Sequence, residues 1–261
     1  MHRHARLTCL AILLCSSLAW ADSSPSTQPG ADAQTTQNDR LAHIHVDAKD
    51  KRISVDCEAL NVTEPLEFFC VTDGGNEYES VLRTPAKPSD IHFALLMLGL
   101  TPGAPATFVP AKREWLPPHG PPLRITCSFQ RKGKTITVPA NQMMRSIADK
   151  KPMPPALWVF DGSRVMQGGL YAADLTGYVV SICNFDYTMI DVPKMVSNSN
   201  DTLEWEYNPD LVPPKGTPVT MTIEPTGGGD TATRPDFAPV SADKFFGGPG
   251  LSEQNSPTSR P

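Results

Sequence analysis

Short segments in which apolar and polar residues alternate constrain the fold of this chain most strongly. Ile53, Val55 and Cys57 alternate with polar residues, and residues 123–129 show the same period of two. A period of two places the apolar side chains on one face of a strand, so these segments predict half-buried strands. Proline supplies 27 of the 261 residues, about twice its ordinary usage, and argues against a helical fold. The pattern predicts a mainly β domain.

Further strands are expected between Gly, Pro, Asn and Asp residues. They cover residues 43–47, 67–72, 78–82, 135–138, 157–160, 177–183, 203–207 and 218–223. Two hairpins are expected, one turning at residues 73–76 and the other at residues 132–134.

One helix, spanning about residues 89–98, is predicted from Ser89 as its N-cap and Gly99 as its C-terminal stop. Nearly all of its faces are apolar, so we expect it to be buried. Residues 141–149 are a weaker candidate for a second short helix. The fold class expected is mainly β (α+β), a compact antiparallel β-rich domain with one buried helix.

The first 21 residues have the features of a secretory signal peptide. Arg3 and Arg6 precede an apolar stretch, and Ala19-Trp20-Ala21 forms a cleavage site. We expect cleavage after Ala21 and a secreted or periplasmic mature protein. An uncleaved anchor and a lipoprotein modified at Cys15 are alternatives, but the stretch is shorter than a spanning helix. No other segment of the sequence is long and apolar enough to span a membrane.

Composition divides the remaining chain into three parts. Residues 22–40 are small and polar and predict a disordered linker, and residues 226–261 predict a disordered Pro/Gly-rich tail. The alternative for the tail is a docking segment that uses its phenylalanines. Residues 41–225 are expected to form one domain. A net charge of −5 offers no basic surface for nucleic acid.

Four cysteines remain after signal cleavage: Cys57, Cys70, Cys127 and Cys183. No two of them form a C-x-x-C pair, so their spacing argues against a zinc ribbon or an iron–sulfur cluster. Cys57 and Cys70 lie on consecutive predicted strands and are candidates for a disulfide, with Cys127 and Cys183 as a second pair. Buried free thiols are the alternative for all four.

Glu77, Glu79 and His92 are the candidate binding residues. The two glutamates share one side of a predicted strand, and His92 lies on the predicted helix, a combination compatible with a metal or acid/base site. The alternative is a solvent-facing strand and a core histidine. His43, His45 and Asp47 offer a similar but incomplete set. The sequence contains no nucleophile motif and no phosphate loop. No cofactor is expected, and whether the protein binds a metal ion is left open.

Several segments share their order and sequence with one known family. They are Cys57 with residues 66–70 (LEFFC), 76–80 (NEYES), 86–96 (AKPSDIHFALL), 171–174 (YAAD), 183–193 and 213–219 (PPKGTPV). Over roughly Ala42 to Pro225, the chain resembles the YdjY domain family of exported, mostly bacterial proteins of unassigned function. The resemblance implies roles for Glu79, His92 and the Cys57 and Cys70 pair.

The chain departs from the family pattern at one position. The family commonly has His before Glu where this chain has Tyr78-Glu79, which weakens a metal site that needs this histidine. Family members have been labelled ferredoxin-like, but the four scattered cysteines do not support an iron–sulfur site here.

These observations lead to three functional hypotheses. The preferred one is a non-catalytic, envelope-associated binding or interaction module with an envelope protein partner. The alternative is an enzyme, metal-dependent or acid/base, that uses Glu77, Glu79 and His92. The second alternative is a redox protein that uses Cys57 and Cys70.

Overall fold

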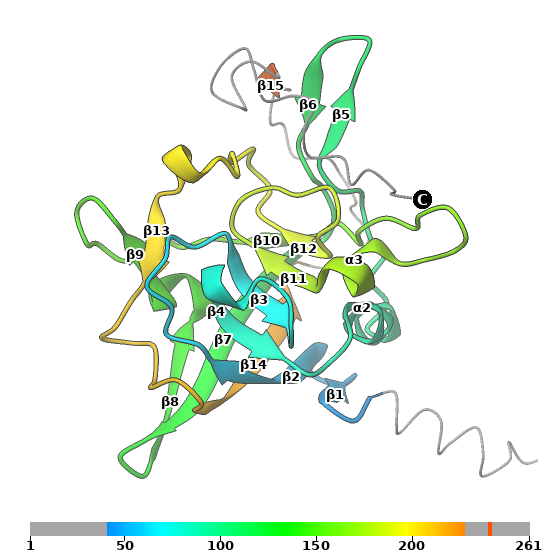
Figure 1. Cartoon of the computed structure of the whole chain (residues 1–261). Coiled ribbons are helices and arrows are strands. Elements are labelled where there is room, and N and C mark those ends of the chain that lie inside the picture. Colours follow the sequence, from blue (N-terminus) through cyan, green and yellow to red (C-terminus); the bar gives the residue numbers. More distant parts are fainter. Residues whose placement is uncertain (1–40, 228–239, 242–261) are drawn as a thin grey trace, which may run out of the picture.

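The computed structural model describes residues 41–227 and 240–241 (Figure 1). The predicted signal peptide (1–21), the linker (22–40) and most of the tail (226–261) therefore lie outside the described residues. The strands are β1 (Ile44–Asp47), β2 (Arg52–Ala59), β3 (Phe68–Thr72), β4 (Ser80–Thr84), β5 (Thr107–Val109), β6 (Glu114–Leu116), β7 (Pro122–Arg131), β8 (Lys134–Pro139), β9 (Met144–Ser146), β10 (Trp158–Phe160), β11 (Tyr178–Ser181), β12 (Ile190–Asp191), β13 (Trp205–Tyr207), β14 (Pro218–Pro225) and β15 (Val240–Ser241). The helices are α2 (Pro88–Met97), α3 (Ala172–Thr176) and the 3-10 turns η1 (Glu77–Glu79), η2 (Ala140–Met143) and η3 (Asn200–Thr202).

Eight strands of the ten-stranded sheet close into a β-barrel. Their order is β2-β14-β7-β10-β12-β11-β3-β4, and β4 pairs again with β2, while β1 and β8 pair outside this ring. The closing seam between β2 and β4 consists of the pairs Glu58–Arg83 and Ala59–Leu82. Closure removes the exposed edges that an open sheet would leave.

The fold prediction was right in its mainly β class and wrong in its architecture. A compact antiparallel domain with one buried helix was expected, whereas the strands close into a barrel in which β3–β4 and β11–β12 are parallel pairs. The reason is physical. A period of two identifies the buried face of a strand, but it does not identify the neighbouring strand or its direction.

The alternating segments supply the barrel core as expected. Met221 on β14 lies between Val55 on β2 and Cys127 on β7 in the strand register, and all three side chains are buried. The intervening positions carry polar residues such as Thr220 and Ser128, which belong to the opposite face. Burial of this continuous apolar face is the main contribution to barrel stability.

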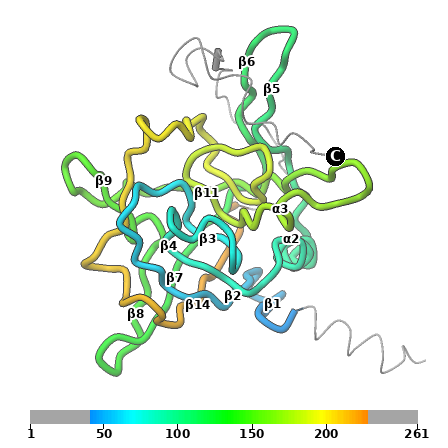
Figure 2. The backbone as a smooth tube through the Cα atoms, viewed as in Figure 1, coloured from blue at the N-terminus to red at the C-terminus, as the bar shows by residue number. Residues whose placement is uncertain are grey.

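One of the two expected hairpins is confirmed. Arg131 pairs with Lys134 across the turn formed by Lys132 and Gly133, whose φ angles of 51° and 74° are those of a tight two-residue turn. The expected hairpin at residues 73–76 is wrong. The chain leaves β3, returns through residues 73–79 and enters β4 parallel to β3 (Figure 2).

Helix α2 forms close to the predicted range but is not enclosed by the core. Leu96 and Met97 are 42% and 43% exposed, and the helix packs against α3, β1 and β2 on its other side. Ser89 does not cap the helix; its backbone N–H donates to Asp174 Oδ1 of α3 at 2.8 Å. Neither α-helix in the described part of the chain is long and apolar enough to cross a membrane.

The second helix expected at residues 141–149 is replaced by the 3-10 turn η2 and the short strand β9. β9 pairs with β13 in a separate two-stranded sheet. A third sheet consists of β5, β6 and β15, and its β5–β6 hairpin projects away from the barrel (Figure 1).

Candidate functional site

Two glutamates meet where β3 and β4 begin. Glu67 directly precedes β3 and Glu79 directly precedes β4, and the parallel register pairs Phe68 with Ser80. The Glu67 backbone N–H donates to the Glu79 carbonyl oxygen at 3.0 Å. The unusual parallel return of the chain thus brings together two carboxyl groups that are twelve positions apart in the sequence.

The Glu67–Glu79 pair holds a proton at neutral pH. Glu67 is only 8% exposed, and burial raises its pKa to about 8, with further contributions from the charge of Glu79 and a hydrogen bond to its side chain. A carboxyl beside a carboxylate in a poorly hydrated place favours a shared proton, because two negative charges repel each other there.

Two tyrosines, Tyr178 and Tyr78, lie near the glutamate pair. The ring centroids of Phe68, Tyr178 and Phe185 lie 4.4 to 5.1 Å apart. Burial and then the charge of Glu67 raise the pKa of Tyr178 to about 12. Tyr78 is 59% exposed, and its pKa is raised first by Glu79. Solvent therefore reaches the site on the side of Tyr78.

A second carboxyl pair, Asp161 and Asp191, lies in the barrel wall. Asp161 follows β10 and Asp191 ends β12, and the antiparallel register of these strands places Asp191 opposite Val159. Both aspartates are fully buried. Asp191 Oδ1 accepts hydrogen bonds from Ser181 Oγ and from the Val192 N–H, both at 2.7 Å. The Oδ2 atoms of both aspartates have no hydrogen-bond partner within the described residues.

Burial also keeps this second pair protonated. The pKa of Asp161 is raised well above its usual range by burial and by the charge of Asp191, and burial raises the pKa of Asp191 to about 7. The molecule thus contains two carboxyl pairs that retain protons near neutral pH, one at the surface and one sealed.

The comparison with protein families supplies the identification. The family model described as YdjY domain matches residues 44–224, which is more than half of the chain. The chain belongs to the YdjY domain family. No curated protein and no solved structure matches it. The matched range contains the YdjY barrel and both carboxyl pairs.

The YdjY domain places its three predicted binding residues in three different surroundings. Glu77 binds Arg83 at 3.1 Å and accepts from the Gly74 N–H at 2.8 Å, so it stabilises its own turn. Glu79 joins Glu67. His92 Nδ1 lies 2.8 Å from Tyr171 Oη. No hydrogen bond or ion pair in residues 41–227 connects Glu79 to His92.

His92 borders the buried aspartate pair instead. Tyr171 Oη donates to the Gly162 carbonyl at 3.0 Å, so it accepts from the His92 Nδ1–H. Burial lowers the pKa of His92, and burial followed by the charge of Asp161 raises that of Tyr171. His92 is therefore a neutral imidazole with a fixed tautomer, held through Tyr171 beside Asp161.

The remaining candidates contribute other interactions. His43 lies 3.6 Å from Asp56, and Asp47 pairs with Arg52 at 3.1 Å. Within the ranges that the structure describes, no group of three or more His, Cys, Asp or Glu side chains is arranged to hold a metal ion. The four cysteines, Cys57, Cys70, Cys127 and Cys183, are buried and free, so neither predicted disulfide is present in this structure.

The sequence reasoning missed Glu67, Asp161 and Asp191 as site residues. A signal was available for two of them, because Glu67 and Asp191 each lie directly between apolar residues of a strand-like run. A charged residue in such a run is rarely buried without a specific partner. The identity of that partner depends on strand pairing, which the sequence pattern did not reveal.

Proposed function

We propose that this YdjY domain is an exported, non-catalytic binding module of the bacterial envelope whose Glu67–Glu79 pair binds a positively charged group of its partner in exchange for the shared proton. The observation that carries the proposal is a proton-sharing carboxyl pair that lies near Tyr178 and beside the exposed Tyr78.

The chemistry of the site favours a cation. An ammonium or guanidinium group placed between Glu67 and Glu79 would neutralise both carboxylates and remove the need for the proton. The faces of neighbouring aromatic rings attract cations as well. A guanidinium fits best, because its planar donors can engage two carboxylates at once.

The arrangement supports binding more than acid/base catalysis. An enzyme that uses Glu77, Glu79 and His92 needs the three groups in one place. In the structure Glu77 is engaged by Arg83, and His92 by Tyr171. The Glu67–Glu79 pair is instead fixed at the start of two barrel strands, a rigid position that suits recognition.

Proton-linked binding tests the proposal. Titration of the protein with a tetra-arginine peptide at pH 7, in buffers of different ionisation enthalpy, is expected to show about one proton released per peptide bound. Glu79→Gln should weaken binding by about tenfold or more and remove the proton release. Glu77→Gln, two positions earlier in the same turn, is the matched control and should keep both.

Two results would contradict the binding site. The first is a Glu79→Gln variant that binds the peptide and releases the proton as the wild type does. The second is a loss of peptide binding in Glu77→Gln but not in Glu79→Gln. The melting temperature of each variant, measured in parallel, separates a loss of binding from a loss of folding. Export is tested separately: the protein recovered from the periplasm or the medium should begin at Asp22.

A further inference from the structure

The β5–β6 hairpin projects from the barrel but is fixed to it at its base. Beyond the ends of the two strands, Ala104 and His119 exchange backbone hydrogen bonds of 2.9 and 3.0 Å. The Gly103 N–H donates to the Phe160 carbonyl oxygen at 3.0 Å, which joins the base of the hairpin to β10. The hairpin therefore keeps a defined orientation on the barrel.

A third strand pairs with the hairpin on the free side of β6. β15 is antiparallel to β6, with Val240 opposite Trp115 and Ser241 opposite Glu114 (Figure 1). On the other side of β6, Phe108 of β5 is opposite Trp115, and the two ring centroids lie 5.5 Å apart. An apolar residue directly opposite an aromatic one is a favourable cross-strand pair. A two-stranded hairpin is only marginally stable alone in water, so a third strand stabilises it.

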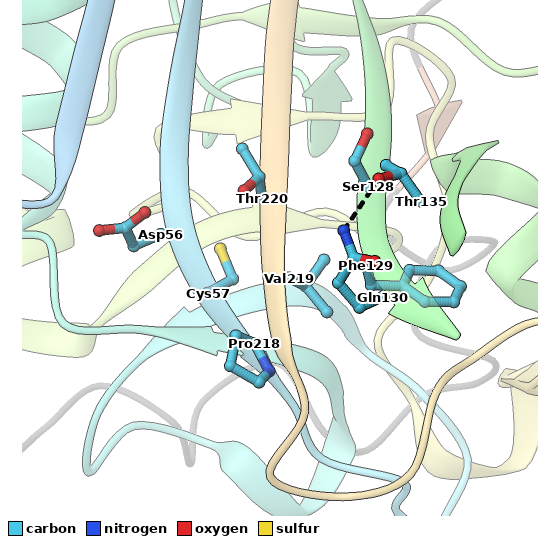
Figure 3. Close-up of a pocket in the computed structure, with 9 residues that line it drawn as sticks. All are labelled: Asp56, Cys57, Ser128, Phe129, Gln130, Thr135, Pro218, Val219 and Thr220. Atoms are coloured by element: carbon cyan, nitrogen blue, oxygen red, sulfur yellow. Dashed lines mark hydrogen bonds between the residues drawn. The ribbon is translucent and has the colours of Figure 1, made fainter. Parts of the chain in front are cut away.

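The outer surface of the barrel offers no comparable place for a strand. Its groove of about 540 Å³ lies over β14 between β2 and β7 (Figure 3). β14 pairs with β2 through residues 218–223 and with β7 through residues 219–225, so it has a hydrogen-bonded neighbour on each side. An extended segment adds only at a sheet edge. β6 has such an edge on the side where β15 pairs.

The tail leaves the barrel close to the base of the hairpin. The Thr226 N–H donates to the Pro122 carbonyl oxygen at 2.8 Å, and Pro122 begins β7 six positions after Leu116 ends β6. Residues 228–239, twelve in number, form the tether that precedes β15. A tether of this length reaches up to about 40 Å, whereas six residues span at most about 20 Å. The tether is therefore long enough for β15 to pair with β6 of its own chain.

We propose that the β5–β6 hairpin is a docking site for the C-terminal tail of the same chain, which adds to β6 as a third strand at Val240–Ser241. Backbone hydrogen bonds attach the segment, and the position opposite Trp115 selects its sequence. The register gives that position to Val240 and not to a phenylalanine of the tail. A tethered segment has a millimolar effective concentration, which favours the chain's own tail over a segment of another molecule. The docked tail covers an edge that would otherwise be open to pairing with other strands.

A cross-link between the paired strands tests the proposal. The full chain carries Glu114→Cys and Ser241→Cys, and Cys9→Ser and Cys15→Ser remove the thiols of the predicted signal peptide. Opposite residues of antiparallel strands have Cα atoms about 4.5 or 5.5 Å apart, and a disulfide accepts both distances. Oxidation with copper phenanthroline should give a monomer with an internal disulfide between residues 114 and 241. The yield should not depend on protein concentration, and dithiothreitol should reverse the link.

Two matched controls define what the cross-link reports. Lys134→Cys with Ser241→Cys should stay unlinked, because Lys134 begins β8, which lies across the barrel from β6 (Figure 1). Val240→Asp, added to the 114–241 pair, should slow the cross-linking by about fivefold, since it removes the apolar residue opposite Trp115. Ser252→Asp adds the same charge to the same tail and should leave the rate unchanged.

Four results would overturn the proposal. They are the absence of a link between residues 114 and 241, a disulfide-linked dimer in place of the internal link, equal linkage in the Lys134 control pair, and an unchanged rate in Val240→Asp. A linked dimer would mean that the tail docks on a second copy of the chain. Circular dichroism and the melting temperature of each reduced variant confirm that the barrel is intact before oxidation.

Discussion

The two carboxyl pairs of this domain have similar chemistry and opposite surroundings. Glu67 and Glu79 meet through a parallel register at the start of two strands, beside the exposed Tyr78. Asp161 and Asp191 meet through an antiparallel register and are fully buried. Both pairs retain protons near neutral pH because burial penalises charge. The exposed Tyr78 beside the glutamates distinguishes the pair that we propose as a binding site from the fully buried aspartate pair.

The two pairs also differ in their hydrogen bonds. Asp191 accepts from Ser181 and from the Val192 amide inside the barrel wall, so it satisfies donors that no water can reach. In the glutamate pair the two side chains bond to each other, and Tyr178 lies nearby. The aspartate pair is therefore part of the structure, whereas the glutamate pair is the one that we propose for binding.

Among the substitutions in the two pairs, replacement of Asp191 should have the largest effect on the free energy of unfolding. Asp191→Ala leaves the Ser181 hydroxyl and the Val192 amide without their acceptor in a dry interior. We expect the free energy of unfolding to fall by about 3 kcal/mol, measured by urea denaturation at pH 7.

Glu67→Gln is the corresponding change in the surface pair. The amide of glutamine can still donate a hydrogen bond to Glu79, so we expect a cost of less than about 1 kcal/mol at pH 7. Equal costs for Asp191→Ala and Glu67→Gln would remove the distinction between a structural pair and a binding pair.

The pH dependence of stability should separate the pairs further. Glu67 has a pKa of about 8 in the folded protein against 4.5 in the unfolded reference, so the folded state binds the extra proton between these values. Stability must then fall as pH rises through this window, by at most about 1.4 kcal/mol per pH unit for one proton.

One variant in each pair shows which carboxyl groups cause the fall of stability with pH. Glu67→Gln should flatten the fall between pH 5 and 8, because the amide does not titrate. Asp161→Asn should remove only the contribution of the aspartate pair to this pH dependence. In that pair Asp191 has a pKa of about 7. Urea denaturation at pH 5, 6, 7 and 8 measures both, and an unchanged slope in Glu67→Gln would contradict a shared proton at the surface.

The same two pairs show how far sequence reasoning reached. The alternation around Val55 and Ile125 identified strands with one buried face, and the glycine at position 133 marked a hairpin that the structure contains. These features are local. The pairing of β3 with its neighbouring strands is not a local feature, because it depends on a parallel return of the chain within residues 73–79. A turn with Asp73 and two glycines favours a hairpin, and the burial of the apolar faces of β3 and β4 in the barrel prevails over that preference.

The candidate site was reached only in part for the same reason. Glu79 was singled out, but with Glu77 and His92 as its companions, since proximity in sequence was the only available guide. Its actual neighbour, Glu67, precedes a different strand. His92 lies beside Tyr171 and Asp161, from segments that are far away in sequence. Side chains that make up such sites are joined by strand register, which an alternating pattern leaves undetermined.

The smallest of the expected effects concerns Tyr171, the link between His92 and the buried aspartates. Tyr171→Phe removes a donor to the Gly162 carbonyl and the acceptor of His92 Nδ1–H, with an expected cost of about 1 kcal/mol. Nitrogen NMR of the imidazole gives a more specific readout. In the wild type, His92 should be neutral at pH 6.5 and protonated on Nδ1, because burial lowers its pKa. In Tyr171→Phe the Nδ1–H tautomer should lose its preference. A wild-type His92 that is charged at pH 6.5, or protonated on Nε2 alone, would contradict the neutral imidazole that donates from Nδ1 to Tyr171 beside the buried aspartates.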